Sequence, residues 1–267
     1  MLERPINQAA GLLTLAGQHD TKLIAMVSHG DEKNELPLLW RLCTSMVQFG
    51  YSVTVLDATT RETANNPGLE QLLQYNYWHS NDHSNAPEWT VIPACTGMQT
   101  LCAKPGSQLQ GRQLLGNLFQ DQGVVVLYGD AQLVAPLLCD STVKPLLAVA
   151  PLKTSLITSY RALKQLLLKG RLEPTIVNLT HESKSVETAA KIGTVAASLS
   201  DCARNFLGYE VNAVNISTLR DDDRPSPELQ RLAMYMLEYA LPLQSDFAGS
   251  NRYPSYSSAT APFAGRH

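Results

Sequence analysis

The sequence predicts a single α/β domain built on a mostly parallel, twisted sheet with helices on both faces. Short apolar or β-branched runs alternate with longer helical patterns along most of the chain. Strands that alternate with helices in this way form parallel sheets covered on both sides. The 267 residues are 44% hydrophobic, which is enough to bury a sizeable core and excludes a chain that is disordered throughout.

The N-terminal part of the pattern is one βαβ unit. The apolar run 23–27 is typical of a buried strand, and the polar stretch 28–35 (SHGDEKNE) favours a loop. A helix is expected from Pro37 to Phe49, because proline is common at the first position of a helix and a glycine, in this case Gly50, commonly follows its end. The next strand is expected at 53–56.

The alternation continues through the rest of the chain. The β-branched run 124–127 is typical of a central strand. We expect strands at 89–92, 124–127, 146–149, 175–178 and 209–216, and helices at 69–75, 109–119, 155–168, 186–206 and 227–239. The expected organisation is an N-terminal segment (1–20), an α/β domain (21–241) and a disordered tail (242–267) that is rich in Ser, Tyr, Pro, Gly and Ala.

Charge and composition exclude several classes of protein. The net charge of −3 gives no basic surface for nucleic acid, and no apolar run approaches the roughly 20 residues that span a bilayer. The N-terminus lacks the pattern of a secretory signal, so a cytoplasmic location is expected. Five cysteines without a CxxC pair indicate neither a disulfide framework nor a zinc site, and we expect them to be buried thiols.

The loop after the first strand is where a nucleotide-binding α/β protein places glycines and a lysine. This loop has one glycine, Gly30, and one cation, Lys33, among the carboxylates of Asp31, Glu32 and Glu35. Several carboxylates repel a triphosphate. The loop therefore predicts a solvated turn and no phosphate cradle.

Several colinear segments nevertheless carry a family resemblance. The stretch 7–12 (NQAAGL) is similar to a DQAxxL motif, 22–28 (KLIAMVS) to the strand that enters a Walker A loop, 53–57 (VTVLD) to the strand with a terminal aspartate, 93–97 (PACTG) to a small-residue turn, 150–160 (APLKTSLITSY) to a "TPEPTSITDAY" stretch, and 176–178 to an "IVN" strand end. Together they resemble the MinD/ParA group of deviant Walker ATPases, most closely its flagellar-number branch, FlhG (FleN). The resemblance implies a P-loop NTPase-like, MinD-like fold.

The same resemblance places a nucleotide site on residues that depart from the family pattern. In the Walker A loop, which follows Ser28 and His29, the deviant lysine falls on Gly30, the phosphate-binding lysine on Glu35 and the magnesium-binding hydroxyl on Leu36. The family's phosphate cation and metal ligand are therefore both missing from this chain.

The carboxylates of the site are altered as well. Asp57 matches the first aspartate of the pattern, but the second falls on Thr59, and the Walker B aspartate falls on Tyr128, with Asp130 nearby. Asn178 matches the asparagine that contacts the base in the family. Phosphoryl transfer depends on the missing groups. The resemblance therefore implies a pseudo-ATPase with no catalytic residue, no metal and no cofactor, ATP with magnesium being the less favoured alternative.

The N-terminal segment is the expected partner-docking element. It carries a short apolar stripe, and in the flagellar branch this element engages the GTPase FlhF. Asn7 stands where that branch has aspartate, and Leu13 where it often has arginine. The expected docking residues are Ile6, Asn7, Gln8, Ala9, Ala10, Leu12 and Leu13.

Other side-chain groups admit two interpretations each. One group is the loop that contains His79, Asp82 and His83. It is either a metal-binding loop or, as we favour, an exposed polar loop. His181 and Glu182 form either a base–orienter pair or, as we favour, a simple surface pair. The final helix is amphipathic but has few cations, so we expect it to pack on the sheet, with only peripheral contact to a membrane if any.

These observations predict a non-catalytic MinD/FlhG-like protein that regulates the assembly or placement of a bacterial cell-envelope machine, with the flagellum favoured. The alternatives are an accessory protein of cellulose or exopolysaccharide secretion and a switch that still binds ATP. A monomer, or a dimer independent of nucleotide, is expected in the cytoplasm, with recruitment to the inner membrane or cell pole. An FlhF-like GTPase or an envelope secretion component is the expected partner.

Overall fold

The computed structural model describes residues 21–75, 89–103, 107–120, 123–150, 153–180, 196–217 and 226–243. In this part of the chain one sheet of eight strands has the order β3-β2-β4-β1-β5-β6-β7, with β8 added to β1. The strands are β1 (Thr21–Ser28), β2 (Val53–Asp57), β3 (Trp89–Pro93), β4 (Val124–Asp130), β5 (Leu146–Val149), β6 (Thr175–Thr180), β7 (Asn212–Ser217) and β8 (Leu241–Leu243). All pairs are parallel except β1 with β8, so the predicted α/β class is confirmed.

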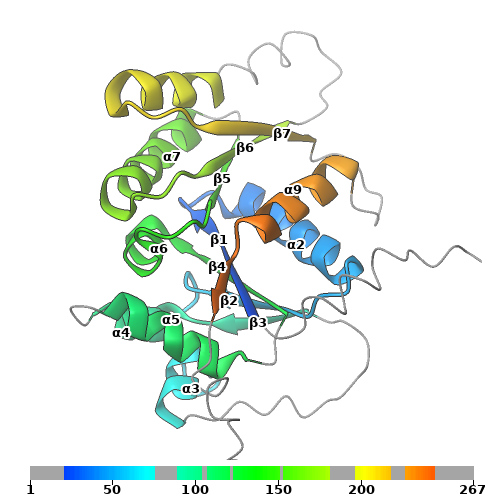
Figure 1. Cartoon of the computed structure of the whole chain (residues 1–267), viewed down its shortest axis with the longest axis vertical. Helices are drawn as coiled ribbons and strands as arrows, with labels where there is room; N and C mark the ends of the chain where they lie inside the picture. The colour runs from blue at the N-terminus through cyan, green and yellow to red at the C-terminus, as the bar shows by residue number, and fades with distance from the viewer. Residues whose placement is uncertain are drawn as a thin grey trace, which may run out of the picture.

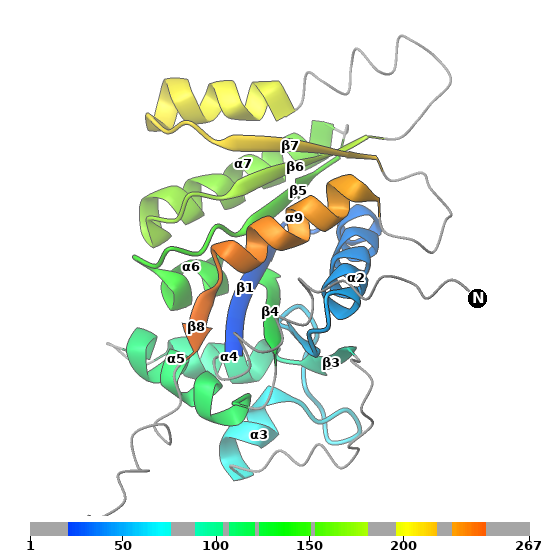
Figure 2. The same cartoon turned by 45° about the vertical axis from the view of Figure 1, so that its right-hand side comes forward.

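Helices cover both faces of this sheet (Figures 1 and 2). One layer holds α4 (Cys95–Cys102), α5 (Ser107–Leu118), α6 (Ala131–Leu138) and α7 (Lys153–Gln165), the last of which continues into a π-helical turn, η1 (Leu166–Gly170). The other layer holds α2 (Glu32–Gln48) and α9 (Pro227–Glu238). The described elements also include α3 (Leu69–Tyr75) and a helix at 196–202 that ends in the π-helical turn η2 (Ala203–Leu207).

Strand β1 lies at the centre and has three partners. Strand β4 pairs with it along residues 22–28, while β8 and β5 divide its other side, β8 at residues 21–23 and β5 at residues 26–27. Residues 242 and 243, which the sequence places in the tail, therefore belong to the sheet. Three residues are too short for a strand pattern to stand out, and only their position beside β1 makes them a strand.

The first helix begins earlier than Pro37, from which the sequence predicts it to start. It begins at Glu32, with Asp31 as the residue before it, and carries Pro37 inside. The loop after β1 is correspondingly shorter than the predicted 28–35. The acidic side chains of the first turn favour this early start, because they interact well with the positive end of a helix.

Two helices have no counterpart among the sequence expectations. Helix α4 occupies part of the segment that resembles a small-residue turn, and α6 follows β4 directly. Asp130 begins α6, since its side chain accepts a hydrogen bond from the backbone N–H of Gln132 at 2.7 Å. Both helices have eight residues, so their apolar spacing is too short to be distinctive.

The final helix packs on the sheet, as expected. Ser226 accepts a hydrogen bond from the N–H of Leu229, and Pro227 occupies the first turn. The apolar face of α9 is buried through Leu229, Leu232, Ala233 and Met236. No described helix is long and apolar enough to cross a bilayer.

The remaining sequence expectations are met in part. Strand β7 begins at Asn212 and ends at Ser217, which shifts the expected strand 209–216, and the expected helix 186–206 is described only from residue 196. The cysteines are free, but only Cys43 is buried, and the other four are partly exposed. The expectation of five buried thiols is therefore wrong.

Candidate functional site

The carboxyl ends of β1, β4 and β2 meet at one edge of the sheet, where sites form in α/β folds. Met26 pairs with Tyr128, and Asp57 pairs with Tyr128 from the other side. The first turn of α2 folds back over this edge and brings Glu35 to it. The structure thus gathers five of the predicted site residues, namely Ser28, His29, Glu35, Asp57 and Tyr128.

The carboxylate of Glu35 fills the loop after β1. Its Oε1 accepts hydrogen bonds from the backbone N–H groups of His29 at 3.0 Å and Asp31 at 3.2 Å. Its Oε2 accepts from the hydroxyl of Ser28 at 2.8 Å and from the phenol of Tyr128 at 2.7 Å. Glu35 is fully buried. A phosphate loop offers its backbone donors to phosphate, whereas this loop donates them to a carboxylate of the same chain.

The ring of His29 extends this network to β5 and α7. Its Nε2 lies 2.7 Å from the carbonyl oxygen of Ala148, so it donates a hydrogen bond there, and it lies 3.4 Å from Oε1 of Glu35. Its Nδ1 lies 2.8 Å from the hydroxyl oxygen of Thr158. One buried histidine thus connects the loop, the sheet and the neighbouring helix. Thr158 lies in the stretch 150–160, but no sequence signal distinguishes it from the other hydroxyls there.

Tyr128 is the residue that the resemblance aligns with the Walker B aspartate. Burial raises the pKa of its phenol well above the ordinary value, and the hydrogen bond and negative charge of Glu35 add to this shift. The phenol is therefore neutral at physiological pH and acts as a hydrogen-bond donor to Glu35. A neutral phenol does not supply the negative charge with which an aspartate holds Mg²⁺.

The other predicted carboxylates serve the local backbone and its hydroxyls. Oδ1 of Asp57 accepts from the N–H of Thr59 at 2.9 Å and from its hydroxyl at 2.6 Å, and Oδ2 accepts from the hydroxyl of Thr60 at 2.7 Å. Asp130 is exposed and caps α6. Gly30 adopts a φ of 91°, a conformation that favours glycine.

Asn178 lies apart from the Glu35 network, in β6 two residues before the end of the strand. Its Nδ2 donates to Oδ1 of Asn215 on β7 at 2.9 Å, and the two residues are register partners. Its Oδ1 is buried and has no hydrogen-bond partner within the described residues. A buried acceptor without a donor is uncommon, because leaving it unpaired costs roughly 1–3 kcal/mol.

A second buried carboxylate, Glu62, has no counterpart among the sequence expectations. It accepts hydrogen bonds from the backbone N–H groups of Thr96 at 2.7 Å and Gly97 at 2.8 Å in the first turn of α4, and from that of Glu70 at 3.4 Å in the first turn of α3. Burial alone raises the pKa of Glu62, but the hydrogen bonds from Gly97 and Thr96 outweigh burial, so its pKa lies below the ordinary value. A β-carbon on Gly97 would lie 2.7 Å from the backbone nitrogen of Glu70, so glycine is needed for this packing. One glutamate thus joins the ends of two helices.

Several predicted residues lie outside the described residues. They are the docking residues of segment 1–20, the histidines and aspartate of the loop 77–87, and His181 and Glu182. Across the described ranges, no group of three or more His, Cys, Asp or Glu side chains is placed to hold a metal ion.

Comparisons with known proteins agree with this architecture. No protein-family model matches the sequence, and no curated protein sequence matches it. Among solved structures, the MinD cell division protein of Aquifex aeolicus is similar, with a TM-score of 0.52, 14% identity, and coverage of 84% of this chain and 99% of that one. A plasmid partition protein of Borrelia burgdorferi has a TM-score of 0.48 and 13% identity over 82% of this chain and 96% of that one. A ParA family ATPase of Chlorobium tepidum has a TM-score of 0.41 and 12% identity over 82% of this chain and 91% of that one.

Identities this low establish the fold alone, and of these likenesses only the one to the MinD structure is close enough to support it. One conclusion follows from the topology of the sheet, the two helical layers and the likeness to MinD. The chain has a P-loop NTPase-like α/β fold that is similar to that of the MinD cell division protein.

Proposed function

We propose that this chain is a MinD-like protein without ATPase activity that acts through protein–protein contacts. The observation that carries the proposal is the position of Glu35, whose carboxylate accepts hydrogen bonds from the backbone N–H groups of the loop after β1. A triphosphate brought to this loop would meet the buried negative charge of Glu35. The exposed side chain of Lys33, in the first turn of α2, does not offset that charge. Repulsion at this point opposes both binding and transfer of the terminal phosphate.

Two further features support the loss of catalysis. Tyr128 offers a neutral phenol where a carboxylate would hold the metal, and both oxygens of Asp57 are engaged by Thr59 and Thr60. Phosphoryl transfer relies on charge placed around the phosphate and on an oriented water molecule. The resemblance to the flagellar branch favours a role in the assembly or placement of a cell-envelope machine, the flagellum before cellulose or exopolysaccharide secretion. Its expected partner is an FlhF-like GTPase or an envelope secretion component.

A ligand switches a protein between two conformations only if it binds one of them more tightly. Without a nucleotide site, nucleotide cannot switch this chain between a monomer and a dimer. We expect a monomer or a dimer that is independent of nucleotide. Calorimetric titration of the full chain with ATP and with ADP, each with magnesium, tests this when light scattering is measured on the same samples. We expect no heat of binding and an unchanged mass, while Aquifex aeolicus MinD in the same assay serves as the comparison protein. Micromolar binding together with a shift to dimer would overturn the proposal.

A second candidate function is a switch that binds nucleotide without hydrolysing it. The observation in its favour is the unpaired Oδ1 of Asn178, which matches the base-contacting asparagine of the family in sequence position. If calorimetry detects nucleotide, the Asn178→Leu variant is expected to weaken that binding about ten-fold, since a site built for a hydrogen bond loses it. The matched control is Asn212→Leu on β7.

A further inference from the structure

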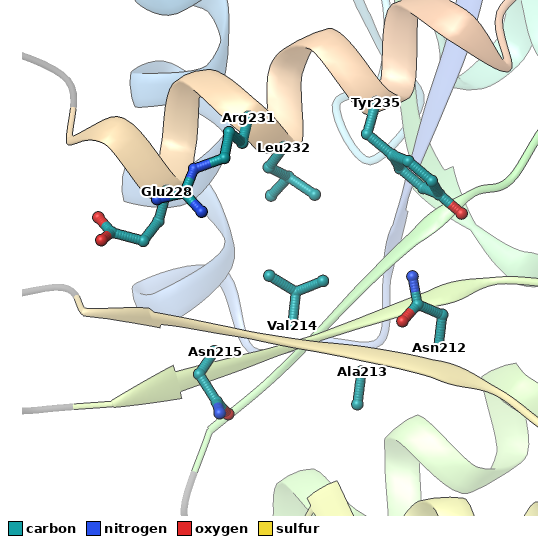
Figure 3. Close-up of a pocket in the computed structure, with 8 residues that line it drawn as sticks. All are labelled: Asn212, Ala213, Val214, Asn215, Glu228, Arg231, Leu232 and Tyr235. Atoms are coloured by element: carbon teal, nitrogen blue, oxygen red, sulfur yellow. The ribbon is translucent and has the colours of Figure 1, made fainter.

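A groove lies between the edge strand β7 and helix α9 (Figure 3). It encloses about 520 Å³ and is lined by Asn212, Ala213, Val214, Asn215, Glu228, Arg231, Leu232 and Tyr235. The segments that the sequence predicts as partner surfaces lie outside the described residues, so this groove is an independent candidate for recognition.

The groove combines an apolar floor with polar ends. Val214 of β7 points towards Leu232 of α9, and Asn212 points towards Tyr235 (Figure 3). Ala213 points to the opposite side of the strand, as alternate residues of a strand do. Leu232 is buried in the core, whereas Val214 is partly exposed, so an apolar side chain of a ligand would contact Val214.

Strand β7 is also the last strand of the sheet on this side. Within the described part of the chain it pairs with β6 alone. An edge strand offers backbone N–H and C=O groups to a further extended chain, and peptide recognition by strand addition uses these groups. The edge of β7 thus favours an extended ligand over a helical one.

Two charged side chains line the groove, Glu228 and Arg231. Glu228 already takes part in another interaction, so Arg231 is the charge that is available to a ligand. Arg231 is exposed, and among the described residues it forms no ion pair or hydrogen bond. It projects from α9 on the side of β7 (Figure 3). A guanidinium without a partner is complementary to a carboxylate, which it binds with two parallel hydrogen bonds.

We propose that this groove binds an extended, acidic segment of a partner protein, which pairs with the edge of β7, places an apolar side chain on Val214 and places a carboxylate on Arg231. Side chains two residues apart lie on one face of a strand, so the ligand pattern is apolar-x-acidic. This inference rests on the proposed interaction role and names the partner's chemistry. It does not depend on the loss of ATPase activity.

The test uses the full chain and labelled peptides whose binding is followed by fluorescence anisotropy without nucleotide. The probe is a short peptide of alternating threonine and valine in which one valine is replaced by glutamate. We expect it to bind at least about five-fold more tightly than the matched peptide with lysine at that place. The same peptide with a central proline is expected to lose binding, because proline removes a backbone donor.

A charge-reversal variant tests whether the peptide preference comes from Arg231 or from the overall charge of the protein. The Arg231→Glu variant is expected to reverse the preference, so that the lysine peptide binds more tightly than the glutamate peptide. The control variant is Lys164→Glu, which makes the same change of charge at an exposed position of α7 in the other helical layer. This control is expected to leave the preference unchanged.

Three results would overturn the proposal. They are equal binding of the glutamate and lysine peptides, an Arg231→Glu variant that keeps the original preference, and absence of peptide binding. If light scattering shows a dimer that the glutamate peptide dissociates, the occupant is a second copy of this chain and the proposed partner is wrong. Peptide binding is measured without ATP. A negative peptide result therefore counts against this groove, whereas heat of ATP binding in the calorimeter counts against the proposed function.

Discussion

The phenol of Tyr128 donates a hydrogen bond to Oε2 of Glu35 at 2.7 Å, across 93 positions of the sequence. Both side chains are fully buried, one near the carboxyl end of β4 and the other in the first turn of α2. This bond joins the end of β4 to the first turn of α2. In the resemblance drawn from the sequence, these two residues align with the family's Walker B aspartate and its phosphate-binding lysine.

Removing the carboxylate of Glu35 is expected to destabilise the fold. The Glu35→Ala variant leaves two backbone donors and the hydroxyl of Ser28 without this acceptor, and it leaves the phenol of Tyr128 only its 3.4 Å hydrogen bond to Ser28. We therefore expect the free energy of unfolding to fall by about 3 kcal/mol. Glu35→Gln retains one acceptor oxygen and is expected to lose about half as much. Urea unfolding followed by circular dichroism measures both. The control is Glu32→Ala, an exposed residue of the same helical turn, and an equal loss in that variant would contradict a special role for Glu35.

Tyr128 makes the stability sensitive to alkaline pH. Its pKa in the folded chain is raised above the ordinary value, which is about 10. Folding therefore favours the neutral phenol, and this stabilisation is complete below the ordinary pKa and is lost as the pH rises above it. We expect the wild-type free energy of unfolding to fall above about pH 10 more steeply than that of Tyr128→Phe. Parallel slopes for the two proteins would refute this assignment.

The pH dependence of stability that Glu62 causes runs in the opposite direction and is seen at acidic pH. Its pKa is lowered, so its stabilisation is present above the ordinary carboxyl pKa and is lost as the pH falls through the lowered value. We expect Glu62→Gln to lower the free energy of unfolding at neutral pH by about 2 kcal/mol, because the charged acceptor of the helix N–H groups is lost. The difference should shrink towards acidic pH, where the wild-type side chain is also neutral. Glu70→Gln in α3 is the matched control, and a difference for Glu62→Gln that does not change with pH would contradict the mechanism.

Cys43 is expected to be the least reactive thiol of the described chain. Burial raises its pKa to about 12, and the thiolate is the reactive form. Iodoacetamide at mildly alkaline pH should leave Cys43 unmodified in the native protein while partly exposed thiols such as Cys95 react. Mass spectrometry of peptides reads the result, and the same treatment in denaturant should modify Cys43 as well. Rapid native modification of Cys43 would mean that α2 opens from the sheet.

The α/β class could be predicted from sequence because it depends on local patterns. The β-branched run of β4 and the alternation of strands and helices are properties of neighbouring residues, and they survive any change of tertiary detail. The resemblance also pointed to Ser28, Asp57 and Tyr128, which lie at or near strand ends, and to Glu35, which the first turn of α2 brings to the same edge of the sheet. Short elements such as α4, α6 and β8 were missed, since a stretch of three to eight residues gives too little periodicity.

The alternation of strands and helices and the acidic character of the loop after β1 follow from local patterns in the sequence. The role of Glu35 depends on contacts that form only when the chain is folded. The sequence predicts a solvated loop, whereas α2 starts early and carries the carboxylate into contact with Ser28 and Tyr128. The reason is physical: a buried carboxylate must find donors, and those donors come from strands far apart in the sequence, which no local pattern records.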